Sequence, residues 1–535
     1  MDSLRRSLLA HAPAISALIE RRAVWVVPLL GLLPVAAHPP LEWHWLGWIA
    51  LAPLLYLLAR GPGGSAWWLG AGWGYGLTHF AAHYFWLPES LLEKAGLQFW
   101  PFLALTVLGL SLLAGYPALA IALSRMAFLR WRVSPCWTFP VLFAAQDALL
   151  GVSPLGGAPW GTAAAAQAGT WAAALAVPLL GGSGLVLLMG AVSAGWAGAF
   201  AAALRGGWAG AVGLAAMAGI TAVLALPSSA PTAGSEAPGF RALLVPGDLP
   251  VSVLADGSRS RETLRYFLSR SLDGLAKAPA RGGEGEESPW LVIWPESAVS
   301  GRASRGRLLA DLFELSVAMD VDFLFGSNAW EGGRVYNSGY LVTGERFRTV
   351  RYDKMRRVPF GEYVPTGFRT LFGKKFTAGD DDYAAGQGPP IVVWRGIRLG
   401  VAICFESVLT AHLREAVEEG AEAIAVLSND QWLTPAAARH HLNLTALRGL
   451  EVGRDVLFAA NGGWSAHLRG GRVLAQSPPG GGAIATEPIR RRHRTPWVRW
   501  GYAPLIALSA GYLAVGLLAV PLAGMLIRRS RGGAG

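Results

Sequence analysis

The sequence predicts a multi-span α-helical membrane bundle joined to an extramembrane domain in which strands and helices alternate. Hydrophobic residues make up 53% of the 535-residue chain, the mean hydropathy is +0.37, and charged residues account for only 15%, against about 25% in soluble domains. Long apolar stretches fill most of residues 1–226, whereas short β-rich runs alternate with helical patterns over residues 240–495. The two regions are therefore expected to lie in different solvents, lipid and water.

Seven apolar stretches precede the α/β region, and most approach the roughly 20 residues that an α-helix needs to cross a bilayer. They cover residues 22–40, 42–59, 64–86, 99–127, 135–151, 178–203 and 206–226. An eighth runs from Trp500 to Ile527 and is followed by Arg528, Arg529 and Arg531. We expect about eight transmembrane helices, of which segment 135–151 is short.

The short loops predict the orientation, because Lys and Arg are enriched on the cytoplasmic side. Arginines precede the first stretch and follow the second, fourth and sixth, at Arg5, Arg6, Arg21, Arg22, Arg60, Arg125, Arg130, Arg132 and Arg205. Both termini are then cytoplasmic, and the α/β region is periplasmic at a cell inner membrane. The cluster from Arg490 to Arg494 lies on the opposite side, where long translocated domains largely escape the charge rule; we expect it to touch anionic headgroups.

Four segments follow from this pattern: a membrane domain at 1–226, a linker at 227–239, a periplasmic catalytic domain at 240–495, and an eighth span with a cytoplasmic tail at 496–535. The linker is rich in Pro, Ser, Ala and Gly. The net charge of +11 gathers beside apolar segments and forms no stripe on the α/β region, so it indicates a membrane surface and no nucleic acid. Strands are expected at 242–245, 291–294, 323–325, 391–394, 399–403 and 423–427, with helices around 264–272 and 308–319.

Three groups of residues lie at or just beyond predicted strand ends, where α/β enzymes usually place their working groups. Glu296 stands in Trp294-Pro295-Glu296-Ser297, Lys354 follows Tyr352-Asp353, and Cys404 opens Cys404-Phe405-Glu406-Ser407. A free thiol has a pKa of about 8.5 and needs a base or a cation nearby to act as a nucleophile at neutral pH. Glu296 can accept the proton. Lys354, together with the backbone N–H after the nucleophile, can stabilise the negative oxygen of a tetrahedral intermediate.

Each residue taken alone has a structural explanation. A single Cys after an apolar strand is more often a small core residue than a nucleophile, and a Glu after Pro or a Lys near two arginines is ordinary solvated charge. The chain holds only Cys136 and Cys404, so a disulfide framework is implausible. The joint occurrence of Glu, Lys and Cys in one order favours chemistry.

That order resembles the nitrilase (carbon-nitrogen hydrolase) superfamily, whose Glu, Lys and Cys triad lies on an α-β-β-α sandwich; the match covers about residues 240–490. The string Lys354 to Pro365, with seven spans before the domain and one after, is more specifically similar to the apolipoprotein N-acyltransferase family. The resemblance assigns the base, lysine and nucleophile to Glu296, Lys354 and Cys404, and supporting roles to Glu362, Glu406 and Phe405. The sequence departs from the family pattern at Ala255 and at Leu433-Thr434, which are expected to lie near the lipid-binding cleft.

The resemblance implies transfer of a fatty acyl group from a phospholipid, through a thioester on Cys404, to the N-terminal amine of an S-diacylglyceryl-cysteine apolipoprotein. This is the last step of lipoprotein maturation. It implies phospholipid and apolipoprotein as partners, a monomer, and no cofactor. The alternatives are a membrane-tethered amidase of the same superfamily, in which water takes the acyl group, and an inactive membrane scaffold.

The histidines predict no metal site. His79 and His83 are four residues apart and could share a helix face, but the sequence shows no third ligand, and packed or interfacial histidines are the commoner explanation. His440 and His441 are adjacent, so on a helix they do not face one site. We interpret that pair as structural.

Overall fold

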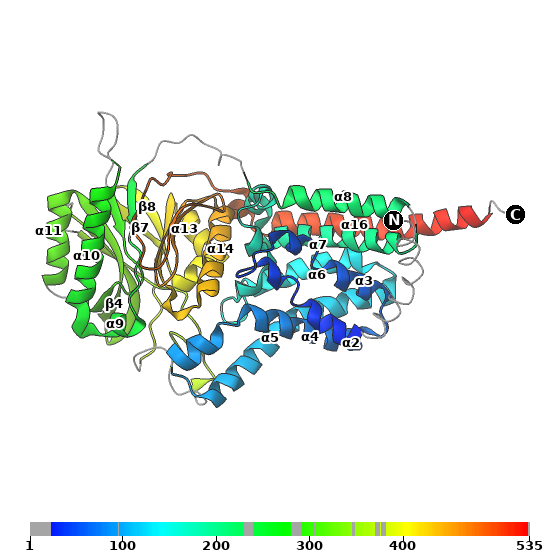
Figure 1. Cartoon of the computed structure of the whole chain (residues 1–535), viewed down its shortest axis with the longest axis horizontal. Coiled ribbons are helices and arrows are strands. Elements are labelled where there is room, and N and C mark those ends of the chain that lie inside the picture. Colours follow the sequence, from blue (N-terminus) through cyan, green and yellow to red (C-terminus); the bar gives the residue numbers. More distant parts are fainter. Residues whose placement is uncertain are drawn as a thin grey trace, which may run out of the picture.

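The computed structural model describes residues 23–94, 96–206, 208–228, 239–279, 290–302, 307–344, 348–369, 375 and 381–532. Most of the predicted linker and the first four arginines used for orientation lie outside the described residues. The chain forms two parts that lie side by side along its long axis, a helical part and an α/β part (Figure 1).

The helical part contains helices in or near every predicted span. They are α2 (Ala23–Leu30), α3 (Ala52–Arg60), α4 (Ser65–His83), α5 (Phe99–Trp131), α6 (Pro135–Leu150), α7 (Trp171–Ala203), α8 (Trp208–Leu224) and α16 (Ala503–Gly532). Of the described helices, α5 and α7 are long and apolar enough to cross a membrane, while Trp25–Ala37, Trp208–Leu224 and Ala503–Leu518 are shorter apolar segments. The expected number of eight spans is not confirmed by these lengths.

The first two predicted spans are wrong as single long helices. In place of 22–40, the chain forms the 8-residue α2 and a 3-10 turn at Val35–Ala37. In place of 42–59, it forms a 3-10 helix at His44–Trp48 and the 9-residue α3. Prolines explain the breaks after α2 and after the 3-10 turn, because a proline removes a helical hydrogen-bond donor and clashes with the preceding turn. Pro34 lies four residues after the end of α2, and Pro39 and Pro40 follow the 3-10 turn. Pro28 is accommodated inside α2, and Pro53 lies in the first turn of α3, where a proline is tolerated.

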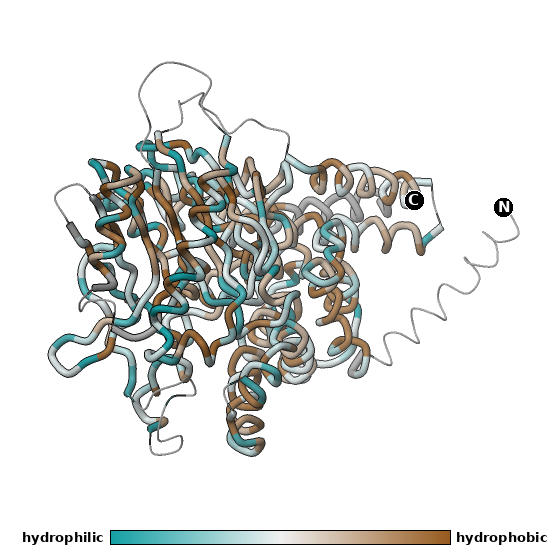
Figure 2. Tube along the Cα trace, turned by 60° about the vertical axis from the view of Figure 1, so that its left-hand side comes forward, coloured by the Kyte–Doolittle hydropathy of each residue, from teal (hydrophilic) through white to brown (hydrophobic). Residues whose placement is uncertain are grey.

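Large apolar side chains are exposed on the helical part, and many segments of its helices are coloured brown, as hydrophobic, in Figure 2. On α5 the exposed fractions of Val107, Leu108 and Leu112 are 56%, 52% and 53%, and Trp208 at the start of α8 is 78% exposed. An apolar surface of this extent is unfavourable in water and favourable in lipid. The helical part is therefore the membrane-facing part of the chain.

The α/β part holds two facing sheets. One runs in the order β13-β1-β2-β4-β5-β6, with β3 beside β4, and the other runs β12-β11-β10-β9-β8-β7. The strands are β1 (Arg241–Leu244), β2 (Trp290–Ile293), β3 (Val299–Arg302), β4 (Val321–Glu331), β5 (Arg334–Thr343), β6 (Arg348–Asp353), β7 (Ile391–Trp394), β8 (Ile397–Ile403), β9 (Ala423–Asn429), β10 (Val456–Asn461), β11 (Ser465–Arg469), β12 (Arg472–Ser477) and β13 (Ile484–Thr486). The pairs β1–β2, β2–β4, β8–β9 and β9–β10 are parallel.

Helices cover the outer face of each sheet. Between the sheets, Leu244 and Leu324 share a buried core with Ile403 and Leu427. On the outer face of the first sheet, α10 (Ser260–Lys277) and α11 (Arg307–Met319) bury Phe267 and Leu312 against a second core. The second sheet is covered by α13 (Thr410–Glu418) and α14 (Pro435–Val452). This layering is the α-β-β-α sandwich that the resemblance implies.

The core beneath the second sheet continues into the helical part, because α14 lies between the two parts (Figure 1). Leu442 and Leu447 of α14 belong to the same buried cluster as Leu185 and Leu187 of α7. The two parts therefore share one continuous apolar interface.

A buried carboxylate crosses this interface. Helix α7 is broken at Gly181, whose φ of 72° is the left-handed conformation that favours glycine, and the Trp497 ring lies 2.9 Å from where a Cβ would stand. The break frees the amide of Gly182, which donates to Oε1 of Glu451 on α14 at 2.7 Å. Glu451 also pairs with Arg448 and accepts from Thr410 at 3.0 Å. One side chain thus ties a membrane-facing helix to the sandwich.

Candidate active site

The predicted base, lysine and nucleophile all follow strand ends in the structure. Glu296 lies two residues after the Trp294 that follows β2, Lys354 comes directly after β6, and Cys404 comes directly after β8. Strands β2 and β6 belong to one sheet and β8 to the other. Because the two sheets face each other, side chains from both reach a common site between them.

Glu296 is held by groups from both sheets. Asn337 on β5 donates its Nδ2 to Glu296 Oε1 at 2.6 Å, and the backbone N–H of Asn429, at the end of β9, donates to Oε2 at 2.9 Å. Burial raises the pKa of Glu296 above the ordinary carboxyl value; the Lys354 ammonium opposes the shift, and Glu362 adds to it. The result is a carboxylate that is fixed in position and more basic than a solvated one.

Lys354 is buried between two carboxylates. Its Nζ lies 2.9 Å from Oε1 of Glu362 and 3.8 Å from Oε1 of Glu296. Burial alone lowers a lysine pKa, but Glu362 and Glu296 outweigh it, so the pKa of Lys354 is raised. The side chain is therefore a fixed cation.

Cys404 stands at a sharp turn between β8 and the 3-10 helix Cys404–Val408, with a φ of 52°. A non-glycine residue in this region is strained, and such strain often marks a functional position. Burial raises the pKa of the Cys404 thiol, the Glu296 carboxylate raises it further, and Lys354 lowers it. The resting group is then a neutral thiol that requires a base, and Glu296 and Lys354 are the charged groups that act on it most strongly.

The two supporting acids occupy distinct places. Glu362 accepts a hydrogen bond from Lys354 and another from the backbone N–H of Val358, at 2.7 Å.

Glu406 is fully buried and accepts hydrogen bonds from four donors. These are Tyr352 Oη, at 2.8 and 2.9 Å, and the backbone N–H groups of Met355, Arg356 and Ile403, at 2.7, 2.9 and 2.9 Å. It therefore joins the loop that carries Lys354 to the turn that carries Cys404. Phe405 is half-buried and packs against the core beneath the second sheet.

Asn337 is a site residue that the sequence reasoning missed. Its Nδ2 donates to Glu362 Oε1 at 2.9 Å as well as to Glu296, and its backbone carbonyl accepts from the Lys354 N–H at 2.8 Å. Strand β5 places residues 335, 337, 339 and 341 on one face. The only signal in the sequence was an amide on the same face as Val335 and Leu341.

The two departures from the family pattern lie in different surroundings. Ala255 ends the short helix α9 (Val251–Ala255) and is exposed. The backbone carbonyl of Leu433 accepts from Lys94 Nζ at 3.2 Å, and that of Trp432 accepts from Ser90. Ser90 and Lys94 belong to the segment Glu89–Lys94 that follows α4. The helical part thus contacts the loop that carries the second departure.

Comparisons with known proteins agree with the two-part architecture. Residues 30–195 match the model of the apolipoprotein N-acyltransferase N-terminal domain, and residues 287–488 match that of carbon-nitrogen hydrolases. An apolipoprotein N-acyltransferase from Ralstonia nicotianae is 30% identical over 96% of this chain and 95% of its own length. One from Caulobacter vibrioides is 29% identical over 91% and 94%.

Solved structures similar to this chain cover about half of it. A carbon-nitrogen hydrolase superfamily protein from Xanthomonas campestris is 17% identical, with a TM-score of 0.35 over 50% of this chain and 96% of that one. A nitrilase superfamily member from Saccharomyces cerevisiae is 14% identical, with a TM-score of 0.36 over 52% and 98%.

Proposed function

The chain belongs to the apolipoprotein N-acyltransferase family, and we propose that it transfers a fatty acyl group from a phospholipid to an apolipoprotein through a thioester on Cys404. Family membership makes it an acyltransferase of a bacterial membrane that acts on lipoproteins. The proposal concerns the residues and the steps. The observation that carries it is the buried Glu296–Lys354 pair, held 3.8 Å apart and electrostatically coupled to the Cys404 thiol.

In the first step, Cys404 Sγ attacks the carbonyl carbon of a phospholipid ester while its proton passes to Glu296. The raised pKa of Glu296 suits this role, because a general base works best when its pKa approaches the operating pH. Lys354 and the backbone N–H of Phe405 stabilise the oxyanion. The carbon–oxygen bond to glycerol then breaks, and the leaving oxygen takes the proton from Glu296. A lysophospholipid departs and the acyl group stays on sulfur.

In the second step, the α-amino group of the diacylglyceryl-cysteine attacks the thioester carbonyl. Glu296 accepts a proton from the amine, the carbon–sulfur bond breaks, and the thiolate takes that proton back from Glu296. The product is an amide, and Cys404 is free again. Lys354 keeps its charge while Glu296 carries the proton, because the Glu362 carboxylate lies 2.9 Å from its Nζ.

The proposed substrates explain why the enzyme would act at a membrane. A phospholipid and a lipid-modified peptide both stay in the bilayer, so an enzyme that joins them gains from being anchored beside it. We assign the membrane domain to 1–226 and 496–535, the linker to 227–239 and the catalytic domain to 240–495. We place the enzyme in the inner membrane as a multi-pass monomer, with its catalytic domain in the periplasm.

The experiment that tests the proposal uses the purified full-length enzyme, phospholipid vesicles and a diacylglyceryl-cysteine peptide. We expect intact-mass analysis to detect one acyl group on the enzyme before the peptide is added, and on the peptide afterwards. An amidase would lose the acyl group to water without the peptide, and an inactive scaffold would never gain it. Either result would refute the transfer.

A further inference from the structure

The pairing of β8 with β9 places Ser428 beside the nucleophile. The two strands are parallel, and Ile403 pairs with Leu427. Cys404 follows Ile403 and Ser428 follows Leu427, so the two residues lie at the same level of the sheet. Ser428 is fully buried, and its hydroxyl forms a hydrogen bond with the Cys404 side chain. A hydroxyl thus reaches the sulfur from β9, a strand separate from those that precede the triad residues.

Asp430 holds the Ser428 hydroxyl in the resting site. Ser428 Oγ donates to Asp430 Oδ1 at 2.6 Å, and Asp430 is 1% exposed. A hydroxyl has one proton to donate and two lone pairs with which to accept. While its proton points at Asp430, Ser428 can accept from the Cys404 S–H but has nothing to donate to a thiolate. The hydroxyl must therefore turn if it is to stabilise a negatively charged sulfur.

His441 keeps Asp430 in place during such a turn. Its Nδ1 lies 3.0 Å from the same oxygen, Asp430 Oδ1, and its Nε2 lies 3.0 Å from Ser407 Oγ. The nitrogen that faces the carboxylate carries the proton, so Nε2 accepts from the Ser407 hydroxyl. Ser407 belongs to the 3-10 helix that begins at Cys404. Asp430 therefore keeps one hydrogen bond when the Ser428 proton leaves it.

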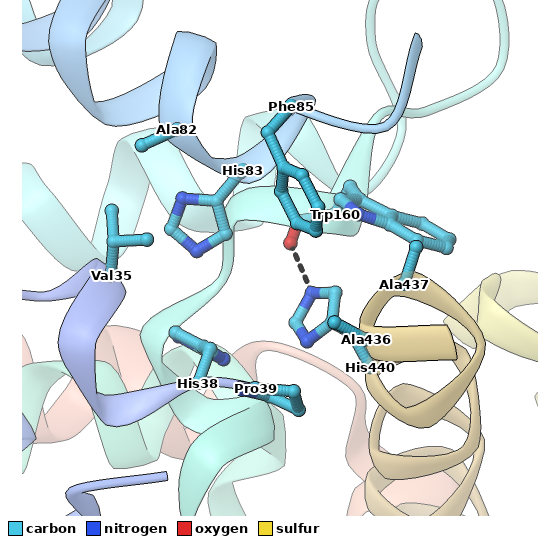
Figure 3. A pocket seen from close by; sticks show the side chains of 10 residues that line it. All are labelled: Val35, His38, Pro39, Ala82, His83, Phe85, Trp160, Ala436, Ala437 and His440. Carbon is cyan, nitrogen blue, oxygen red and sulfur yellow. Dashed lines mark hydrogen bonds between the residues drawn. The ribbon is translucent and has the colours of Figure 1, made fainter. Parts of the chain in front are cut away.

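The helix that carries His441 is also anchored to the helical part. His440, the preceding residue of α14, has its Nε2 2.6 Å from the carbonyl oxygen of Trp160, the contact drawn as a dashed line in Figure 3. His440 and His441 are 4% and 2% exposed. One imidazole thus contacts the membrane-facing part and the next contacts the turn of the nucleophile. Both contacts restrict the position of His441.

We propose that Ser428 is a further catalytic residue, whose hydroxyl turns from Asp430 to the Cys404 sulfur when that sulfur becomes negatively charged. Asp430 and His441 are positioning residues, because they act through Ser428. The proton stays on Ser428 Oγ throughout, and only its acceptor changes. The charge arises twice in the proposed reaction, when Cys404 loses its proton and when the carbon–sulfur bond breaks. This role rests on Cys404 being the nucleophile of the proposed function.

Ser428 and Asp430 act on the sulfur in opposite directions. Burial is the largest cause of the raised pKa of the Cys404 thiol; Glu296 raises that pKa further and Lys354 lowers it. Asp430 also raises the thiol pKa, whereas the Ser428 hydrogen bond lowers it. Loss of the Ser428 hydroxyl should therefore disfavour the thiolate, and loss of the Asp430 charge should favour it. Side chains that only fill space would not give two effects of opposite sign.

The test measures the rate at which iodoacetamide alkylates Cys404 in the full-length enzyme in detergent, at one neutral pH and with Cys136→Ala as the background. The thiolate is the form that reacts. Ser428→Ala should lower the rate about three- to tenfold. A hydrogen bond to a charged group changes the thiolate fraction by about ten- to a hundredfold, and the greater nucleophilicity of a more basic thiolate offsets part of this loss. Asp430→Asn keeps an acceptor oxygen for His441 and removes the charge, so it should raise the rate.

Ser316→Ala is the matched control. Ser316 is 1% exposed and donates to Asp322 at 2.8 Å on the outer side of the first sheet, so this variant loses a similar buried hydrogen bond away from the sulfur. Its alkylation rate should equal that of the background enzyme. Equal rates in Ser428→Ala and Ser316→Ala would overturn the role of Ser428, as would a change of the same sign in Ser428→Ala and Asp430→Asn. If Ser428→Ala does not fold, an unchanged or lower rate in Asp430→Asn overturns it as well.

Alkylation needs no acyl donor, so it separates this role from the acyl transfer itself. An acyl group on Cys404 together with unchanged alkylation rates would refute the role of Ser428 alone. Changed alkylation rates without any acyl-enzyme would refute the proposed function, while Ser428 would still be shown to act on the sulfur.

Discussion

At the scale of single residues, the division of charge in the site gives Glu296 and Glu362 different tasks. Lys354 is nearer to Glu362, at 2.9 Å, than to Glu296, at 3.8 Å. Glu362 is therefore the principal counter-ion that keeps the lysine charged. Glu296 is left with a raised pKa and free to exchange a proton with sulfur or nitrogen.

The two cysteines give the simplest test of the nucleophile. Cys404→Ala should abolish acyl-enzyme formation and lower turnover by several orders of magnitude, because the covalent route disappears. Cys136→Ala should leave turnover nearly intact, because Cys136 lies in the first turn of α6, far along the chain from the sandwich. Intact-mass analysis and a peptide acylation assay measure both. Equal loss in the two variants would contradict the assignment.

Substitution of Glu296 or of Lys354 should slow the acylation of Cys404, each for a different physical reason. Glu296→Gln keeps the size and one of the two acceptor oxygens but removes the base, so the rate of Cys404 acylation should fall about a hundredfold or more. Lys354→Met keeps an apolar stem and removes the cation, which should cost at least about a hundredfold through lost oxyanion stabilisation. Single-turnover acylation from phospholipid measures both rates. A wild-type rate in Glu296→Gln would remove Glu296 as the base for this step.

The pKa shifts predict the pH dependence of acylation. Glu296 is a base only when ionised, and its pKa lies above the ordinary value of 4.5, so the rate should fall as the pH drops through a value higher than 4.5. The raised pKa of Lys354 predicts no matching loss on the alkaline side until beyond its ordinary 10.5. Single-turnover acylation rates measured over a range of pH test this prediction. The Tm at each pH shows whether the enzyme stays folded. An acid limb at or below 4.5 would contradict the environment described for Glu296.

At the scale of elements, the sequence predicted strands that have a local apolar pattern and missed strands that depend on pairing with distant parts of the chain. The expected strands at 242–245, 291–294, 391–394, 399–403 and 423–427 are present as β1, β2, β7, β8 and β9 within two residues at either end. The apolar runs of β1, β2, β8 and β9 are buried on both faces, so each appears in the sequence as a continuous apolar run; β7 is the exception, because Val393 is exposed. Strand β4 extends to Glu331, well past the expected 325, because it pairs with β5 along its whole length. Strand β5 carries Arg, Asn and Gly and is stabilised by its pairing with β4, and β6, which carries Arg and Asp, is stabilised by its pairing with β5.

The same distinction separates the triad from Asn337. Glu296, Lys354 and Cys404 each follow a strand within a short string, so chain order was enough to propose them as site residues. Asn337 contacts Glu296 and Glu362 across 41 and 25 residues of chain. No local pattern indicates such a contact.

The junction of α7 with α14 predicts a large stability effect. In Glu451→Gln, the buried Arg448 loses its charged partner, and breaking a buried pair in this way costs about 3 to 5 kcal/mol. Glu331→Gln is the matched control, since its pair with Arg351 has the Glu side chain 65% exposed and contributes at most about 1 kcal/mol. Thermal unfolding in detergent should show a much lower Tm for Glu451→Gln. Equal Tm values would mean that Glu451 does not hold the junction.

At the scale of the whole molecule, composition predicted two parts in two solvents, and the apolar surface of the helical part agrees with it. Hydropathy alone did not predict where the helices of the first two apolar stretches end. Residues 22–59 are apolar enough to suggest two spans, but in the described part of this segment α2 ends at Leu30 and α3 begins only at Ala52. Hydropathy averages over a window, whereas proline acts at one position.

The orientation of the two parts is the last prediction. The arginines of the shorter loops place both termini in the cytoplasm and the sandwich in the periplasm, whereas the cluster from Arg490 to Arg494 would favour the reverse. In a variant lacking both native cysteines, single cysteines are placed at Ser252, which is exposed on α9, and at Ser530, near the end of α16. A membrane-impermeant thiol reagent added to cells with a permeable outer membrane should label the first and should label the second only after lysis. Reversed labelling would mean that the cluster sets the orientation and that the acyl transfer takes place in the cytoplasmic leaflet.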